Sequence, residues 1–146
     1  MSLRDPDTIA NWRRLDARVT TSGQPTMAQL GDIASLGVRH IINLGLHTQA
    51  QALPGEAEAV ARLGMNYIHI PVDFAAPTEV DFILFRTAYE STAPDLVHVH
   101  CIFNWRVSAF FYRYRRDFLG MEAAVARADM DPIWTPHGVW ADFIAP

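Results

Sequence analysis

The chain has 146 residues, of which 50% are hydrophobic and 19% are charged, and its formal net charge is -4. This composition is typical of a globular protein, and the length is sufficient for one hydrophobic core, so we expect a single domain over residues 1–146. The negative charge argues against nucleic acid as a partner. All 12 basic residues are arginines, which leaves no lysine for Schiff-base chemistry.

Few features of the sequence bear on cellular location. The single cysteine, Cys101, cannot form an intramolecular disulfide, so nothing indicates an oxidising compartment. The polar N-terminus lacks the apolar core of a signal peptide, and no stretch is long and apolar enough to span a bilayer. We therefore expect a cytoplasmic protein without a membrane partner, and a leader removed and replaced by Met1–Leu3 stays the open alternative.

Strands and helices alternate along most of the chain. Residues 9–15 form a lead-in, and short β-branched runs then predict strands at residues 17–21, 38–44, 65–70 and 97–101. Apolar spacing and capping signals predict helices between them at residues 27–36, 56–63 and 78–90, with Thr26 as an N-cap and Thr78 to Asp81 as a capping box. Beyond the last strand we expect helices from Val107, from Met121 to about Ala128, and after a cap at Thr135-Pro136.

This alternation predicts an α/β fold. Strands separated by single helices imply right-handed crossovers, and hence a parallel-stranded central sheet of about four to five strands with helices on both faces. Ligands of such sheets bind beyond the carboxyl ends of the strands. Cys101 and Asp73 both follow strands at such ends, so we expect them to lie close together.

The stretch from His100 to Ser108 has the features of an anion-binding loop. A buried strand leads to Cys101, and a helix with Arg106 at its start follows. This arrangement directs backbone N–H groups and a helix dipole at one point, which binds anions and lowers a thiol pKa. Cys101 is then a candidate nucleophile and Arg106 a bidentate clamp, although a cysteine after a strand is commonly a small buried hydrophobe. Asn104 suits the turn because asparagine tolerates positive φ, and a solvent-facing loop asparagine is the alternative.

The loop resembles the signature His-Cys-x-x-Gly-x-x-Arg-Ser/Thr of cysteine-based phosphatases. Aligned from Cys101, Asn104 takes the glycine position and Ser108 the hydroxyl position, whereas Arg106 comes one residue early. Ser-Gly-Gln-Pro-Thr at 22–26, Ile-Ile-Asn-Leu at 41–44 and Tyr-Ile-His-Ile-Pro-Val-Asp at 67–73 precede it. In this order they resemble the small bacterial tyrosine/dual-specificity phosphatase-like family, also called beta-lactamase-hydrolase-like phosphatases, over about residues 17–119.

The resemblance implies a cysteine-phosphatase-like fold and a two-step hydrolysis of a phosphomonoester without metal or cofactor. The Cys101 thiolate would attack phosphorus, and Arg106 with the amides of residues 102–106 would hold the oxygens. Asp73 would protonate the leaving oxygen, Ser108 would donate to the departing thiolate, and His100 would order the loop. The remaining loop residues would contact the substrate: Ile102, Phe103, Asn104 and Trp105.

The early arginine leaves other functions open. The string also fits the rhodanese pattern Cys-x-x-Gly-x-Arg-Ser, which favours a sulfurtransferase, but rhodaneses lack the upstream elements in this order. If the loop keeps its length, Arg106 is rotated by about 100° around the helix start, and the protein is then a weak phosphatase or an anion-binding module. Asp73 could instead be a turn residue, since Pro and Asp favour turns.

The partners follow from the same features. A phosphorylated protein or small molecule is the expected substrate, with phosphate or sulfate at the loop. His98 and His100 share one face of a strand, and with His69 they hint at a metal site, but no carboxylate-rich motif accompanies them, so we expect no metal. Neither the substrate nor the oligomeric state follows from the sequence.

Overall fold

The computed structural model describes residues 4–146, so Met1–Leu3, where a replaced leader was considered, lie outside the described part. Its sheet has five strands in the order β1-β2-β5-β3-β4. Their bounds are β1 Arg13–Arg14, β2 Val19–Ser22, β3 His40–Asn43, β4 Asn66–His69 and β5 Val97–His100. All neighbours pair in parallel except β1, which pairs antiparallel with β2 at the edge. The predicted α/β class is confirmed, and the sheet is parallel as predicted except at its β1 edge.

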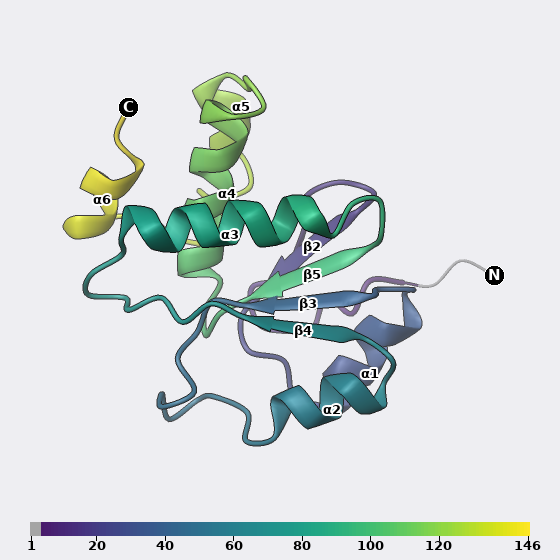
Figure 1. Cartoon of the computed structure of the whole chain (residues 1–146). Helices are drawn as coiled ribbons and strands as arrows, with labels where there is room; N and C mark the ends of the chain where they lie inside the picture. Colours follow the sequence, from purple (N-terminus) through teal and green to yellow (C-terminus); the bar gives the residue numbers. More distant parts are fainter. Residues whose placement is uncertain (1–3) are drawn as a thin grey trace.

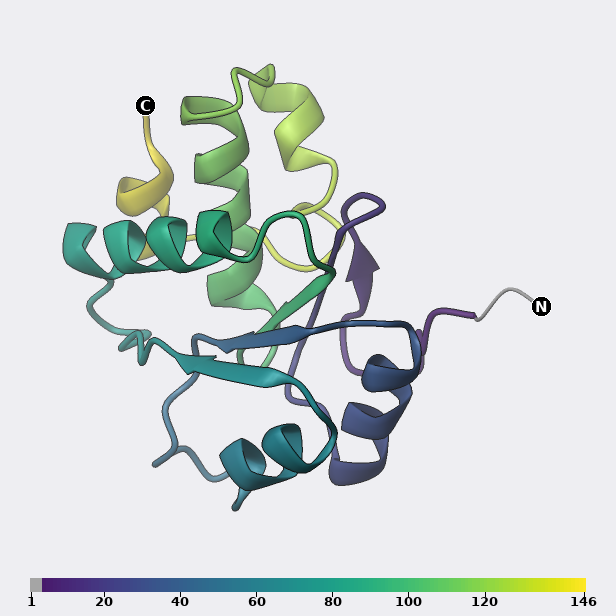
Figure 2. The same cartoon turned by 45° about the vertical axis from the view of Figure 1, so that its right-hand side comes forward.

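Helices cover both faces of this sheet (Figure 1). On one face lie α1 (Met27–Ser35) and α2 (Glu56–Arg62), and on the other lie α3 (Glu79–Ser91) and α4 (Trp105–Asp117) with α5 (Ala123–Arg127) and α6 (Val139–Ile144). Figure 2 shows the same layers turned by 45°. Adjacent strand residues serve opposite faces: Ile41 is buried in the cluster with Leu30 of α1, and Ile42 in the cluster with Phe85 of α3.

Local signals account for where the helices begin. Thr26 and Gln29 form a complete capping box at α1, and Thr78 and Asp81 form another at α3. Each box satisfies backbone N–H groups that the first turn of a helix leaves without partners. The N-cap at Thr26 and the box at Thr78 are therefore confirmed.

One strand was not predicted, and two predicted helix starts are wrong. Strand β1 was not expected, because its two arginines carry no apolar alternation; it pairs with β2, and Arg13 bonds Asp129 at 2.9 Å. Helix α4 begins at Trp105 rather than Val107, which places Arg106 in the first turn. The last helix begins after Gly138 rather than at Thr135-Pro136.

The C-terminal segment packs onto α3 and α4 through aromatic rings. Trp140 is almost fully buried and donates from Nε1 to the Phe74 carbonyl at 2.7 Å, while Phe143 stacks on Phe110. This contact ties the end of the chain to the segment after β4, which borders the candidate site. Within residues 4–146, no helix has the length and apolarity needed to cross a membrane.

Candidate functional site

A cavity of about 160 Å³ opens where the loops after β3, β4 and β5 meet. It is lined by Gln49, Phe74, Cys101, Phe103, Trp105 and Arg106. The only cysteine and the arginine that follows it in the loop therefore share one cavity, as the sequence led us to expect. Its position beyond the carboxyl ends of parallel strands is where ligands of α/β proteins bind.

The loop after Cys101 turns its carbonyl groups outward. The Cys101 carbonyl accepts from His100 Nδ1 at 3.0 Å, the Ile102 carbonyl from the Gln24 amide at 3.0 Å, and the Phe103 carbonyl from Asn11 Nδ2 at 2.8 Å. In a trans peptide the N–H points opposite to the C=O, so the amides that follow point away from these partners. The N–H groups of residues 102–106 make no hydrogen bond with any residue that the structure describes. Successive free amides of this kind form an anion-binding nest.

Asn104 makes the turn that this nest requires. It has φ 64° and precedes α4, so it adopts the left-handed conformation that was predicted for it as the substitute for glycine. Its buried side-chain amide donates to the Asn11 carbonyl at 2.8 Å and to Thr21 Oγ1 at 3.0 Å. With the bond from Asn11 to Phe103, two asparagines therefore hold the loop from both sides, and the solvent-facing alternative is wrong.

Arg106 is buried and reaches into the same cavity. Its Nη1 donates to the Val72 carbonyl and its Nη2 to Gln49 Oε1, both at 2.8 Å. Both acceptors are neutral, and Arg106 makes no ion pair with a carboxylate in residues 4–146. A buried charge is costly unless it is paired. A bound anion would therefore stabilise this guanidinium, and the described part of the chain supplies none.

The Ser-Gly-Gln-Pro segment at residues 22–25 packs against the loop that follows Cys101. A Cβ added to Gly23 would lie 2.5 Å from the Ile102 carbonyl oxygen, so the close approach of the two backbones requires glycine here. Gln24 follows with its backbone amide on Ile102 and its side-chain Nε2 on Glu56 Oε1 at 2.7 Å. The segment thus acts on the residues on both sides of Cys101.

Glu56 and His100 form a buried ion pair next to Cys101. His100 Nε2 lies 2.6 Å from Glu56 Oε2, and the side chains are 0% and 2% exposed. Burial raises the pKa of the Glu56 carboxyl, but the bond to His100 and the charge of His100 outweigh it, and the pKa is lowered overall. The Cys101 carbonyl can only accept, so His100 Nδ1 carries a hydrogen, and His100 Nε2 faces a carboxyl whose pKa is lowered.

His98 has a different role. Ser22 Oγ donates to the Gly23 carbonyl, so it accepts from His98 Nε2, and Nδ1 then accepts from Thr20. Burial, with a smaller contribution from the charge of His100, lowers the pKa of His98 well below its usual value, so the ring is neutral. Its two nitrogens are occupied in linking β2 to β5. In the described residues, no cluster of three metal-ligating side chains occurs.

Asp73 and Ser108 are not among the residues that line the cavity. Asp73 is exposed and its carboxylate accepts from the Ala75 amide at 2.9 Å, in a local turn. It lies between Val72, which holds Arg106, and Phe74, which lines the cavity. The Ser108 hydroxyl donates to the Trp105 carbonyl and accepts from Trp134 Nε1. In this conformation it therefore serves the first turn of α4, not the thiol.

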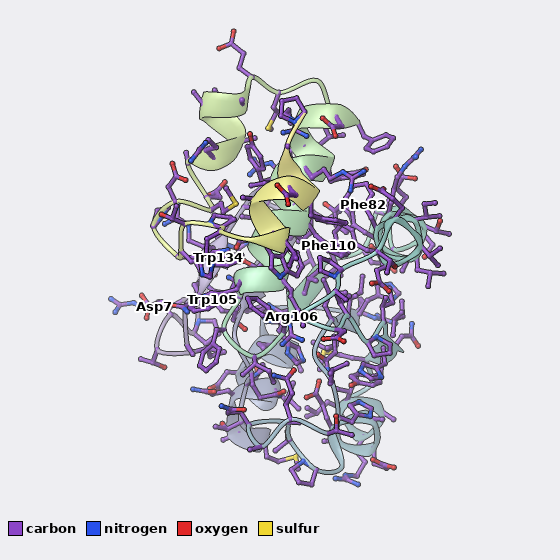
Figure 3. The ribbon with its side chains drawn as sticks, turned by 90° about the vertical axis from the view of Figure 1, so that its left-hand side faces the viewer. Asp7, Phe82, Trp105, Arg106, Phe110 and Trp134 are labelled. Carbon is purple, nitrogen blue, oxygen red and sulfur yellow. The ribbon has the colours of Figure 1, made fainter. Side chains whose placement is uncertain are left out.

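Aromatic rings form much of the cavity wall. Trp105 stacks on Trp134 with ring centroids 4.9 Å apart, and Figure 3 shows this pair beside Arg106 at one end of α4. Phe74 packs against both tryptophans, and Phe103 is 47% exposed at the other side of Trp105. The wall therefore offers flat apolar surfaces next to Arg106.

The sequence did not reveal Gln49, Glu56 or Asn11 as parts of this region. Each lies far along the chain from Cys101, and only the fold brings it near. Glu56 begins a short helix in which Ala59 and Val60 are also buried, but the sequence does not distinguish it from the exposed Glu58. Gln49 and Asn11 lie in segments without any pattern.

The chain is similar in sequence to a known protein, although it matches no family model. It is 28% identical over 131 residues to the beta-lactamase hydrolase-like protein of Agrobacterium fabrum (strain C58), over 86% of this chain. The match spans only 28% of the length of that relative.

Solved structures show the same likeness. A candidate phosphatase of the DUF442 group from Shewanella putrefaciens CN-32 has a TM-score of 0.83 and 28% identity, covering 93% of this chain and 87% of its own. TpbA from P. aeruginosa, in a complex with pTyr, has a TM-score of 0.69 and 15% identity, covering 88% of this chain and 75% of its own. The fold is thus that of the protein-tyrosine-phosphatase-like proteins. The resemblance predicted from the sequence is confirmed.

Proposed function

We propose that this protein is a cysteine-dependent phosphatase that hydrolyses a phosphomonoester through a phosphocysteine. The observation that carries the proposal is Arg106, a buried cation without a carboxylate partner in the described chain, in one cavity with Cys101. A phosphate bound on the nest of residues 102–106 would supply the missing charge. Its phosphorus would then lie next to the thiol.

The first step is attack of the Cys101 thiolate on phosphorus, which forms an S–P bond and breaks the P–O bond to the leaving group. Asp73 donates its proton to the leaving oxygen, and Arg106 and the loop amides stabilise the charge on the remaining oxygens. In the second step Asp73, now ionised, takes a proton from water as the water attacks phosphorus. Inorganic phosphate leaves and the thiolate returns.

His100 favours the thiolate. Its ring donates to the Cys101 carbonyl and lies on the residue before the thiol, so a positive charge on the ring stabilises an adjacent negative charge. The Glu56 carboxyl orients that ring, and Gln24 holds Glu56. The Ser-Gly-Gln-Pro segment therefore contributes to thiol activation through a chain of hydrogen bonds.

The cavity favours an aromatic phosphomonoester over a polyphosphate. Phe74, Phe103 and Trp105 line it, and Arg106 is the one cation among its lining residues. A ligand with several phosphates would need several cations, whereas an aryl phosphate needs one clamp and apolar walls. The pTyr complex of TpbA supports a phosphotyrosine-like substrate, from a protein or a small molecule.

One set of assays separates this function from its rivals. The purified protein and its Cys101→Ser variant are tested on p-nitrophenyl phosphate, and on thiosulfate with cyanide. Phosphate release that is lost in Cys101→Ser supports the proposal. Thiocyanate production that depends on Cys101 would establish a sulfurtransferase instead, and phosphate binding without turnover would establish an anion-binding module.

A further inference from the structure

The loop between β3 and α2 contributes Gln49 to the cavity. Gln49 is fixed in its own turn: its amide donates to the Leu46 carbonyl at 3.2 Å, and its carbonyl accepts from the Ala52 amide at 3.0 Å. Its side-chain Oε1 also accepts from the Leu46 amide at 3.2 Å. The Oε1 atom that accepts from Arg106 is therefore also bound to the backbone of its own turn.

Arg106 is held between two loops. Nη2 donates to Gln49 Oε1, and Nη1 donates to the Val72 carbonyl from the loop after β4. These bonds matter because Arg106 comes one residue earlier in the sequence than the signature arginine. Two fixed acceptors on opposite loops can direct such a side chain into the Cys101 cavity.

Both acceptors leave the charge of Arg106 intact. The other arginines of α4 contact carboxylates: Arg113 bonds Glu79, Arg115 bonds Asp129 and Arg116 bonds Asp117. A glutamate at position 49 would hold the guanidinium at least as firmly, but it would cancel the charge that an anion needs. The amide of glutamine orients the cation without neutralising it.

We propose that Gln49 is a positioning residue for anion binding, which directs Arg106 into the cavity and keeps its positive charge available. The proposal rests on the proposed function of this cavity, since it concerns the same anion site. It assigns a role to the loop of residues 45–54, which the phosphatase signature does not contain. It also explains how an arginine in a displaced position can act as a clamp.

The test compares two substitutions in one loop. Gln49→Glu adds a carboxylate beside Arg106, and Gln51→Glu adds the same charge at an exposed position two residues away. Sulfate affinity is measured by calorimetry, because sulfate keeps its charge from acid to neutral pH. We expect Gln49→Glu to bind sulfate at least about tenfold more weakly than wild type at neutral pH, and Gln51→Glu to stay within about threefold.

The pH dependence separates charge from structure. As the pH falls and the carboxyl of Gln49→Glu becomes protonated, its sulfate affinity should return toward that of wild type, while the ratio for Gln51→Glu stays constant. Gln49→Met, which removes the acceptor without adding charge, should lower kcat/KM on p-nitrophenyl phosphate by about tenfold. Circular dichroism confirms that each variant is folded.

Equal losses in the two glutamate variants, or a loss in Gln49→Glu that does not depend on pH, would overturn the proposal. Wild-type activity in Gln49→Met would do the same. If the wild-type protein binds sulfate but releases no phosphate from any ester, the proposed enzyme function fails, and the sulfate affinities still decide the role of Gln49. A wild-type protein that binds no sulfate overturns both.

Discussion

The buried pair of Glu56 and His100 gives the most quantitative prediction. Glu56→Gln keeps the shape of the side chain and removes its charge. The buried His100 then loses its carboxylate partner, and the new NH₂ group must face either Gln24 Nε2 or His100 Nε2, where Glu56 has an acceptor oxygen. We therefore expect lower stability and a less reactive thiol at Cys101.

The expected loss of stability follows from the burial of this ion pair. Removing one partner of a buried ion pair costs about 3–5 kcal/mol, and a hydrogen bond to a charged group contributes about 1.5–3 kcal/mol. Because glutamine retains one acceptor oxygen, we expect the lower limit, a loss of about 3 kcal/mol in the free energy of unfolding at neutral pH. Glu58→Gln, in the same helical turn but exposed, is the matched control and should change it by less than about 0.5 kcal/mol.

The pH dependence has a definite sign. The pKa of Glu56 is lowered on folding, so its contribution to stability is present above its ordinary value of 4.5 and is lost as pH falls through the lower, folded value. Urea unfolding of both proteins from neutral to acid pH should show the difference between wild type and Glu56→Gln shrinking in that range. A difference that is independent of pH, or one no larger than that of Glu58→Gln, would refute the buried ion pair.

Other substitutions test separate parts of the site. Gly23→Ala places a Cβ against the Ile102 carbonyl and should destabilise the protein by about 1–3 kcal/mol in urea unfolding. Asn104→Gly keeps the positive φ and should lose only the side-chain bonds, whereas Asn104→Ala should weaken sulfate binding further; equal affinities would argue against a conformational role. Arg106→Lys keeps the charge without the planar fork and should lower kcat/KM on p-nitrophenyl phosphate by about 10²–10³. Asp73→Asn should lower kcat by about 10²–10⁴ with little change in sulfate affinity, and an unchanged kcat would exclude it as the acid.

The sequence was sufficient for the fold because its signals are local. The capping residues Thr26 and Thr78 begin their helices where predicted, and the short β-branched runs form the parallel strands. The left-handed conformation of Asn104 could also be predicted, because few residues other than glycine tolerate positive φ. The same reasoning missed β1, since Arg13 and Arg14 form a strand only through their pairing with β2.

The supporting residues of the site could not be read in this way. Glu56 and Gln49 act through contacts that join segments more than forty residues apart, and no periodicity marks such contacts. The start of α4 at Trp105 also depends on such contacts, because the outward bonds of the loop carbonyls, among them the one from Asn11, shape the turn before it. The sequence therefore singled out Cys101 and Arg106, but not the neutral acceptors that hold Arg106 in the cavity.

In the proposed mechanism, the Cys101 thiol carries the phosphoryl group during hydrolysis. The most direct measurement is to mix Asp73→Asn with p-nitrophenyl phosphate, quench in acid within milliseconds to seconds, and locate phosphate by peptide mass spectrometry. Because p-nitrophenolate leaves without being protonated, the loss of Asp73 should slow mainly the second step, and we predict that a phosphoryl group accumulates on Cys101. Release of p-nitrophenol without phosphate on Cys101, or with phosphate on another side chain, would contradict the account.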